Sequence, residues 1–264
     1  MALPDFSIRQ LLEAGVHFGH HTRRWNPKMK SFIYGSKNGV HIIDLDKTAL
    51  YLDRAMEFIK LMVGQGKSIM LVSTKPQASK LIMDAARGSS MPYVINKWIP
   101  GLVTNFSTIK KRIKYFNDLY NSEKSGELEK YTKKEISKFK KELIKLDDAF
   151  GGVRDLDKLP QMIFVADVIR DKIVVKEANK MKIPVIAIVD SNADPNGIDY
   201  LIPANDDASK SIKIISKAIT DAFIDAISSL SGFTLLMIFF NISSIFNILL
   251  ILRVKEQKNS SSIN

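Results

Sequence analysis

Short apolar runs alternate with amphipathic helical patterns along most of the chain. The run at 68–72 is almost unbroken, as is typical of a strand buried on both faces of a parallel sheet. Apolar residues recur with helical spacing before and after it, and the same order returns in the second half of the chain. The predicted strands are 68–72, 162–166 and 185–189, and the predicted helices are 46–63, 77–87, 172–180 and 208–228. This alternation predicts an α/β fold with a doubly wound parallel sheet flanked by helices.

A helical hairpin is predicted to interrupt this alternation. Apolar residues step by threes and fours on either side of a turn at Ser125-Gly126, which predicts two facing seams of an inserted antiparallel coiled coil. The seam residues are Ile109, Ile113, Phe116, Tyr120, Ile136, Phe139, Leu143, Leu146 and Phe150. We therefore expect a discontinuous α/β domain at 1–103 and 151–230, a hairpin insertion at 104–150 and an atypical apolar tail at 231–264.

Residues 14–43, which we call the basic segment, contain no carboxylate. They carry all four histidines and five cationic side chains, namely Arg23, Arg24, Lys28, Lys30 and Lys37. Glycines and Pro27 break the segment, so we expect an irregular surface, with two short strands flanking a turn at Asn38-Gly39. Cationic side chains bind phosphate oxygens, and flat rings stack on exposed bases. The alternative is a solvated basic loop with ordinary aromatic anchors.

Composition supports an anionic partner. The 264-residue chain has a formal net charge of +11 and a pI near 9.6, which favours nucleic acid or an acidic membrane surface. The predicted hairpin is also basic, with 12 lysines and arginines against 6 acidic residues between Ser107 and Leu146. Its cluster Lys110-Lys111-Arg112 is a second candidate for contact with RNA, although charged residues on a hairpin are often only its solvated face.

Candidate enzyme chemistry is limited to a few carboxylates. Asp167 and Asp190 follow predicted strands at the edge where α/β enzymes place their sites, so a magnesium-dependent nucleotide-binding enzyme is the alternative hypothesis. Aspartates are also common in turns, and we favour that role. The chain has no cysteine and no Gly-x-Gly-x-x-Gly motif, and glycine interrupts the histidines at 17, 20 and 21. We therefore expect no catalytic residue, no cofactor and no bound metal.

Several ordered motifs resemble the bacterial-type family of small-subunit ribosomal protein two. They begin with Ala14-Gly-Val-His-Phe-Gly-His20, Arg24-Trp-Asn-Pro-Lys-Met-Lys30 and Val40-His-Ile-Ile-Asp-Leu45, continue with Val72-Ser-Thr-Lys75, Asn96-Lys-Trp98, Thr104-Asn105 and Tyr131-Thr-Lys-Lys-Glu135, and end with Val189-Asp190 and Asn205-Asp-Asp207. The resemblance spans about residues 7–228. It implies a flavodoxin-like α/β domain with a protruding coiled-coil hairpin, and a non-enzymatic protein of the small ribosomal subunit.

The resemblance also implies partners and a site. The family binds small-subunit rRNA, contacts neighbouring ribosomal proteins and helps to dock the large messenger-binding ribosomal protein one, in a cytoplasmic or, alternatively, an organellar ribosome. The residues expected to face RNA or to frame the RNA-facing surface are Arg23, Arg24, Trp25, Asn26, Lys28, Lys30, Lys37, Lys75, Lys97, Trp98, Thr104, Asn105, Lys110, Lys111 and Arg112.

The chain departs from the family pattern in two places. At Lys97-Trp-Ile-Pro-Gly101 the common bacterial pattern is Arg-Trp-Leu-Gly-Gly, so Pro100 fixes a backbone angle that glycine leaves free. The second departure is the C-terminal tail, since family members usually end in a polar extension whereas 226–252 contains no charged residue. This tail is expected to pack on the domain or a neighbour. The alternatives are membrane contact through 232–252, as in a membrane-tethered adaptor, or drift of the sequence.

Overall fold

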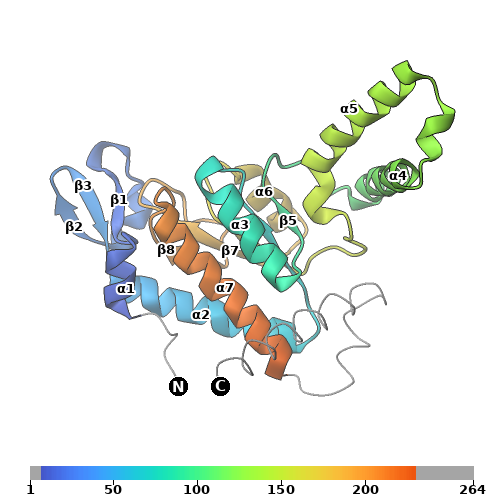
Figure 1. Ribbon diagram of the computed structural model, residues 1–264. Helices are drawn as coiled ribbons and strands as arrows, with labels where there is room; N and C mark the ends of the chain where they lie inside the picture. The colour runs from blue at the N-terminus through green and yellow to red at the C-terminus, as the bar shows by residue number, and fades with distance from the viewer. Residues whose placement is uncertain (1–6, 230–264) are drawn as a thin grey trace, which may run out of the picture.

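A computed structural model of the chain describes residues 7–229, apart from the side chain of Glu129 (Figure 1). The apolar tail predicted at 231–264 lies outside this part. Within residues 7–229, no helix combines the length and the apolar character needed to cross a membrane.

A parallel sheet of five strands forms the centre of the fold. The strands are β4 (Ile69–Val72), β5 (Tyr93–Val94), β6 (Met162–Val165), β7 (Val185–Val189) and β8 (Tyr200–Pro203). Their order is β5-β4-β6-β7-β8, and every neighbouring pair is parallel. This is the strand order of flavodoxin-like folds, so the predicted α/β class is confirmed. Strands β4, β6 and β7 are fully buried, which explains their unbroken apolar sequences.

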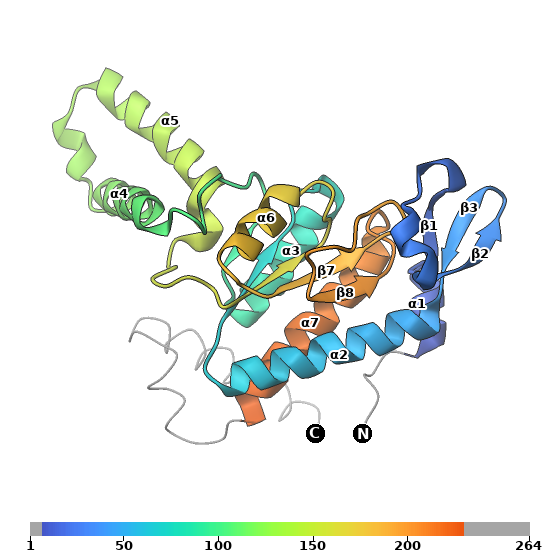
Figure 2. The same cartoon turned by 180° about the vertical axis from the view of Figure 1, so that it is seen from behind.

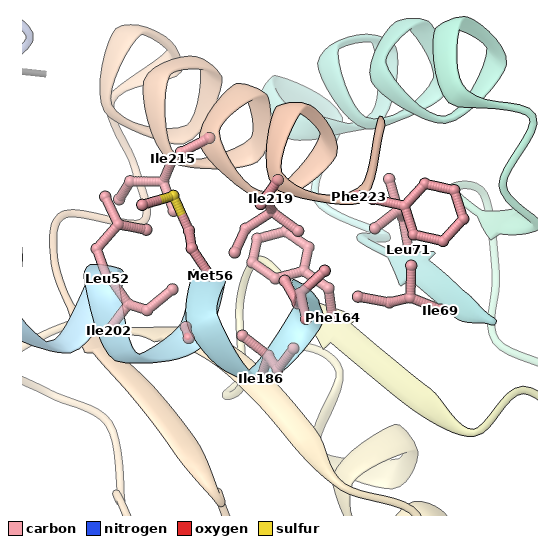
Figure 3. Close-up of a cluster of buried hydrophobic side chains, with 14 of the residues drawn as sticks. Leu52, Met56, Ile69, Leu71, Phe164, Ile186, Ile202, Ile215, Ile219 and Phe223 are labelled. Carbon is pink, nitrogen blue, oxygen red and sulfur yellow. The ribbon is translucent and has the colours of Figure 1, made fainter. Parts of the chain in front are cut away.

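Helices cover both faces of the sheet. One layer contains α1 (Ile8–Glu13), α2 (Leu45–Gly64), α3 (Pro76–Ser89) and α7 (Ser209–Ser229). In Figure 3, Leu52 of α2 lies beside Ile202 of β8, and Phe223 of α7 lies beside Leu71 of β4. Successive strand residues point to opposite faces, so Met70 belongs to the cluster of the other layer. That layer contains α6 (Lys172–Lys180) and the hairpin helices.

The hairpin helices are α4 (Phe106–Lys124) and α5 (Lys133–Phe150), inserted between β5 and β6 (Figures 1 and 2). Short 3-10 turns lie after each of them, at Glu127–Lys130 and Gly151–Val153. Helix α5 begins with a capping box, in which Thr132 and Glu135 satisfy each other's backbone N–H groups. Buried residues of both helices share one apolar cluster with the sheet. The division of the chain into domains at 103, 150 and 230 stays a prediction.

The basic segment forms a small antiparallel sheet beside the main one, which we call the N-terminal sheet. Its strands are β1 (Phe18–His21), β2 (Ile33–Lys37) and β3 (Val40–Ile43), in the order β1-β3-β2. Two 3-10 helices, Thr22–Arg24 and Pro27–Phe32, lie between β1 and β2. Asn38 and Gly39 both have positive φ, so the predicted turn between β2 and β3 is confirmed.

Candidate nucleic-acid interface

The N-terminal sheet is fixed to the carboxyl-terminal edge of the parallel sheet by backbone contacts. Ser191, which follows β7, accepts hydrogen bonds from the N–H groups of His20 (2.7 Å, to Oγ) and Asn26 (2.7 Å, to the carbonyl). The Asn205 N–H, after β8, donates to the carbonyl of Val16 at 3.0 Å. Gly19 is required for this approach, since a Cβ there would lie 2.6 Å from Ser191 Oγ. The basic segment is therefore a positioned surface.

The predicted cations of this segment all reach solvent. Arg23, Arg24, Lys28, Lys30 and Lys37 are exposed, while Met29 and Phe32 are buried and hold the intervening turn. Lys28 Nζ lies 2.8 Å from Asp194, in an ion pair whose two side chains are about half exposed. Exposed pairs of this kind contribute little stability, so Lys28 can exchange its partner for a phosphate.

Trp25 and Asn26 support this surface. The Trp25 ring is half-buried and lies 4.9 Å from the ring of His41 in β3. Asn26 Oδ1 accepts from the N–H of Lys28 and caps the 3-10 helix that begins at Pro27. The geometry gives Asn26 a turn-forming role, and Trp25 keeps part of its ring available for stacking.

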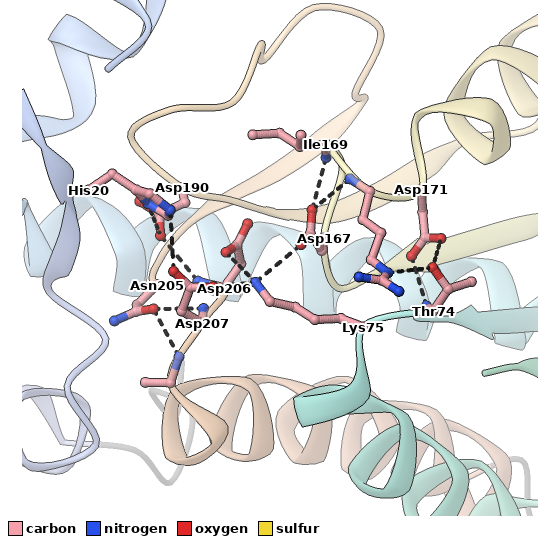
Figure 4. A network of polar contacts seen from close by, with 12 residues as sticks. His20, Thr74, Lys75, Asp167, Ile169, Asp171, Asp190, Asn205, Asp206 and Asp207 are labelled. Atoms are coloured by element: carbon pink, nitrogen blue, oxygen red, sulfur yellow. Dashed lines mark hydrogen bonds and ion pairs between the residues drawn. The ribbon is translucent and has the colours of Figure 1, made fainter. Parts of the chain in front are cut away.

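Lys75 does not reach this solvent-facing surface. It lies in the loop after β4, where its ammonium contacts Asp167 (3.1 Å), Asp206 (2.8 Å) and Asp207 (2.6 Å), as Figure 4 shows. Burial acts to lower the pKa of Lys75, but the hydrogen bonds to Asp206 and Asp207 outweigh it and raise the pKa. With 8% of its surface exposed, Lys75 is the centre of a buried ion-pair network, and its expected contact with RNA stays a prediction.

The carboxylates near Lys75 affect the pKa of Asp206. Burial and the neighbouring charges of Asp167 and Asp190 raise the pKa of Asp206 to about 7. His20 extends the network, since its two ring nitrogens lie 3.2 Å from Asp190 and 3.2 Å from Asp207. The hydrogen bond to Asp190 raises the pKa of His20 despite its partial burial. His20 therefore ties the N-terminal sheet to the parallel sheet, most strongly when its imidazole is protonated.

This network occupies the position where flavodoxin-like folds bind ligands. The strand order reverses between β4 and β6, and the loops after these strands are joined by Lys75 with Asp167 and by Thr74 with Asp171 (Figure 4). Asp167 also accepts the N–H groups of Ile169 and Arg170, as a turn residue does. Among residues 7–229, no group of three or more histidines and carboxylates is arranged to hold a metal ion. The enzyme hypothesis based on Asp167 and Asp190 has no support in this geometry.

A second candidate surface is the loop between β5 and α4. Lys97 and Asn105 are exposed, but Trp98 is buried. The carboxylate of Glu177, on α6, accepts hydrogen bonds from the Trp98 indole (3.2 Å), from the N–H of Gly101 (2.7 Å) and of Val103 (3.3 Å), and from both the N–H (3.3 Å) and the hydroxyl (3.1 Å) of Thr104. Trp98 and Thr104 therefore frame this loop.

The electrostatics of Glu177 follow from these contacts. Burial acts to raise its pKa, but the hydrogen bonds from the loop, led by the Gly101 N–H, lower it. Gly101 has φ of +93°, so the glycine after Pro100 makes the turn that directs its N–H at the carboxylate. Sequence reasoning did not identify Glu177. The sequence feature that could have identified Glu177 is its position on the inward face of a helix, between Val174 and Ala178, which are both buried.

The candidate residues of the hairpin lie apart from the basic segment. Lys110, Lys111 and Arg112 are exposed on α4, and Lys110 pairs with Asp157 at 3.3 Å. Figures 1 and 2 place the hairpin and the N-terminal sheet at opposite ends of the parallel sheet. The sequence-predicted residues thus form separate groups, and their contacts with RNA stay predictions.

Comparison with known proteins identifies relatives that all belong to one family. Residues 11–226 match the family model described as ribosomal protein S2. The chain is similar to the small ribosomal subunit protein uS2 of Agrobacterium fabrum, with 47% identity over 235 residues, which cover 88% of this chain and 91% of that protein. The protein of the same name from Mycobacteroides abscessus is 46% identical over 226 residues, covering 86% of this chain and 82% of the relative.

Proposed function

Since the chain belongs to the ribosomal protein S2 family, and is thus a structural, non-enzymatic constituent of the small ribosomal subunit, we propose that it binds small-subunit rRNA through the basic segment. The relatives named above are bacterial, which favours the ribosome of a bacterial cytoplasm over an organellar one. Binding by phosphate contacts involves no chemical step, and its affinity depends strongly on salt.

One observation supports this proposal above the others. Five cations are exposed on a stretch without a carboxylate, and backbone hydrogen bonds to Ser191 and Asn205 fix that stretch to the core. Since its geometry is set before binding, little ordering is needed when RNA arrives. The loop at 97–105, held by Glu177, is the next candidate surface.

The test is the salt dependence of binding to a small-subunit rRNA transcript. Changing Arg23, Arg24, Lys28 and Lys30 together to Gln should reduce the slope of log affinity against log salt by up to about 3, since each lost phosphate contact removes about 0.7–0.9. The matched control changes Arg54, Lys60, Lys213 and Lys217 to Gln, which are exposed on α2 and α7. A slope equal to that of the control would remove the basic segment from the interface.

Two finer roles belong to the same proposal, one implied by the family and one by the apolar tail that departs from it. Docking of ribosomal protein one is tested by adding that protein to subunits that contain or lack this chain, with retention only on the former expected. Membrane contact through 232–252 is tested by comparing the full chain with a version ending at Ser231. Equal recovery of both with ribosomes, and of neither with membranes, would exclude it.

A further inference from the structure

The outward side of α6 combines cations with exposed apolar side chains, and we call it the α6 surface. Its members lie on the helix or in the turn before it, and they are Ile169, Arg170, Lys172, Ile173, Lys176 and Lys180. All six are exposed, and the two isoleucines expose 46% and 45% of their surface. The lysines stand at positions i, i+4 and i+8, so they form one row along the helix, with Ile173 in the next row.

The α6 surface is uncovered within residues 7–229. The opposite side of α6 packs on β6 and β7, and Val174 and Ala178 are buried there. Figures 1 and 2 place α6 and α3 on opposite sides of the sheet. In Figure 4, the side chain of Ile169 points away from the ion pairs of Lys75. The outward side of α6 is therefore open to a partner.

The cations of the α6 surface have no carboxylate beside them in the described part of the chain. Between residues 168 and 189 the acidic side chains are Asp171 and Glu177, and both are buried. Asp171 accepts hydrogen bonds from Thr74, and Glu177 accepts them from the loop at 98–104. Among the described side chains, no ion pair involves a cation of the α6 surface.

The composition of the α6 surface is unfavourable for the chain alone. Like charges at i, i+4 destabilise a helix, and Lys172 stands in the first turn, where the helix dipole disfavours a cation. The two isoleucines leave apolar surface in water, which burial in an interface would remove. A partner that brings carboxylates to the lysine row and apolar side chains to the isoleucines would relieve both.

The two isoleucines favour a protein partner over a nucleic acid. Phosphates bind cations, and exposed bases stack on aromatic rings or guanidinium planes, whereas an aliphatic side chain does neither. An apolar centre with a charged rim is the arrangement of protein interfaces, and opposite charges across the rim select the partner. We propose that the α6 surface binds an acidic protein segment. Its apolar side chains cover Ile169 and Ile173, and its carboxylates face the lysine row.

This inference goes beyond the proposed function, since it concerns a protein partner and a different part of the molecule. Glu177 holds the loop at 98–104 against α6, so the partner meets a backbone that is already fixed. The tests below change no residue of the basic segment. Their failure would therefore leave RNA binding by that segment unaffected.

The first test measures, by fluorescence polarisation, the binding of two labelled acidic peptides to the full chain. The probe is an amphipathic helix of about 14 residues with leucines on one face and glutamates on the other, and the second peptide has serine in place of leucine. We expect the probe to bind about tenfold more tightly. Changing Ile169 and Ile173 to Thr should remove this preference. Changing Lys172, Lys176 and Lys180 to Gln should weaken binding of both peptides and flatten its salt dependence.

Matched controls replace the same residue types at exposed positions elsewhere. They are Leu50→Thr with Leu61→Thr on α2, and Lys210, Lys213 and Lys217 to Gln on α7, and they should bind both peptides as the wild type does. Equal affinity for the two peptides, or α6 variants that bind like these controls, would overturn the proposal. So would an α6 lysine variant that keeps peptide binding but has a smaller slope in the rRNA salt titration, since that result identifies RNA as the partner.

The second test identifies the partner chemistry in assembled particles and does not depend on the folding of a multiple variant. Because the chain has no cysteine, Ile173→Cys provides a single thiol for a benzophenone photocrosslinker at the centre of the α6 surface. In small subunits reconstituted with this chain, we expect a crosslinked peptide whose sequence places apolar residues among carboxylates. A crosslink to RNA, a crosslinked peptide without acidic residues, or no crosslink above the cysteine-free background would each overturn the proposal.

Discussion

Replacing Glu177 by Gln should release the loop that presents Lys97 and Asn105. The carboxylate accepts hydrogen bonds from the Trp98 indole and the Gly101 N–H on one oxygen, and from Val103 and Thr104 on the other. Gln keeps one acceptor oxygen and places an NH2 group where the second oxygen was. Whichever way the amide turns, two or more donors of the loop lose their acceptor and face another donor.

The size of the effect follows from the number of donors left unpaired. Glu177 is 9% exposed and Val103 is 1% exposed, so water replaces the lost acceptor poorly. An unsatisfied buried donor costs about 1–3 kcal/mol, and hydrogen bonds to a charged group are the stronger kind. Two unpaired donors then give a loss of roughly 2–6 kcal/mol in the free energy of unfolding, which is a large fraction of the stability of a typical domain.

Urea unfolding and tryptophan emission measure this change together. In a Trp25→Phe background, Trp98 is the only tryptophan, so a red shift of its emission reports exposure of the loop before global unfolding. Lys176→Gln, at an exposed neighbouring position of α6, is the matched control and should change neither signal. A Glu177→Gln protein with an unfolding free energy within about 0.5 kcal/mol of wild type and unshifted Trp98 emission would refute the reasoning, since surface substitutions alone have effects of that size.

Two further predictions concern the edge of the parallel sheet. The pKa of Asp206 is raised from 3.8 to about 7, so the folded protein binds this proton more tightly than the unfolded chain does. The free energy of unfolding should therefore fall by up to about 4 kcal/mol as the pH rises from 4 to 7. In urea titrations at several pH values, Asp206→Asn should flatten that fall. His20 acts in the same direction above pH 6.5, because its pKa is also raised. Gly19→Ala should lower stability by about 1–3 kcal/mol, since the new Cβ meets Ser191, whereas Gly35→Ala, with open space around it, should be neutral in the same unfolding assay.

The sequence predicted the elements whose pattern is local. The helix predicted at 46–63 is α2 at Leu45–Gly64, and the strand predicted at 162–166 is β6 at Met162–Val165. The strands that were missed, β1 in the N-terminal sheet and β5 and β8 in the parallel sheet, are defined by pairing. Tyr93–Val94 is a two-residue strand, and Tyr200–Pro203 pairs with β7 but ends in proline, so neither carries a periodic signal.

The same distinction applies to the site. Charge along the chain predicted the exposure of Arg23, Arg24 and Lys37, because a cation without nearby acids stays in water. It did not predict the burial of Lys75, whose carboxylate partners lie 92 to 132 residues further along the chain and meet it only when the sheet has formed. Glu177 was missed for the same reason, since its loop partners lie more than 70 residues away.

The buried network explains why this α/β fold suits a structural protein. The point where the strand order reverses is where such folds usually bind a ligand, and here the side chains of Lys75, Asp167 and Asp206 occupy it. The same contacts join the loops after β4, β6 and β8 into one rigid edge, on which the N-terminal sheet is seated through Ser191. In the proposed function, binding falls to a segment added to this core, the basic segment. For the proposed role in binding rRNA, a rigid edge that holds the basic segment in place is more useful than an open crevice.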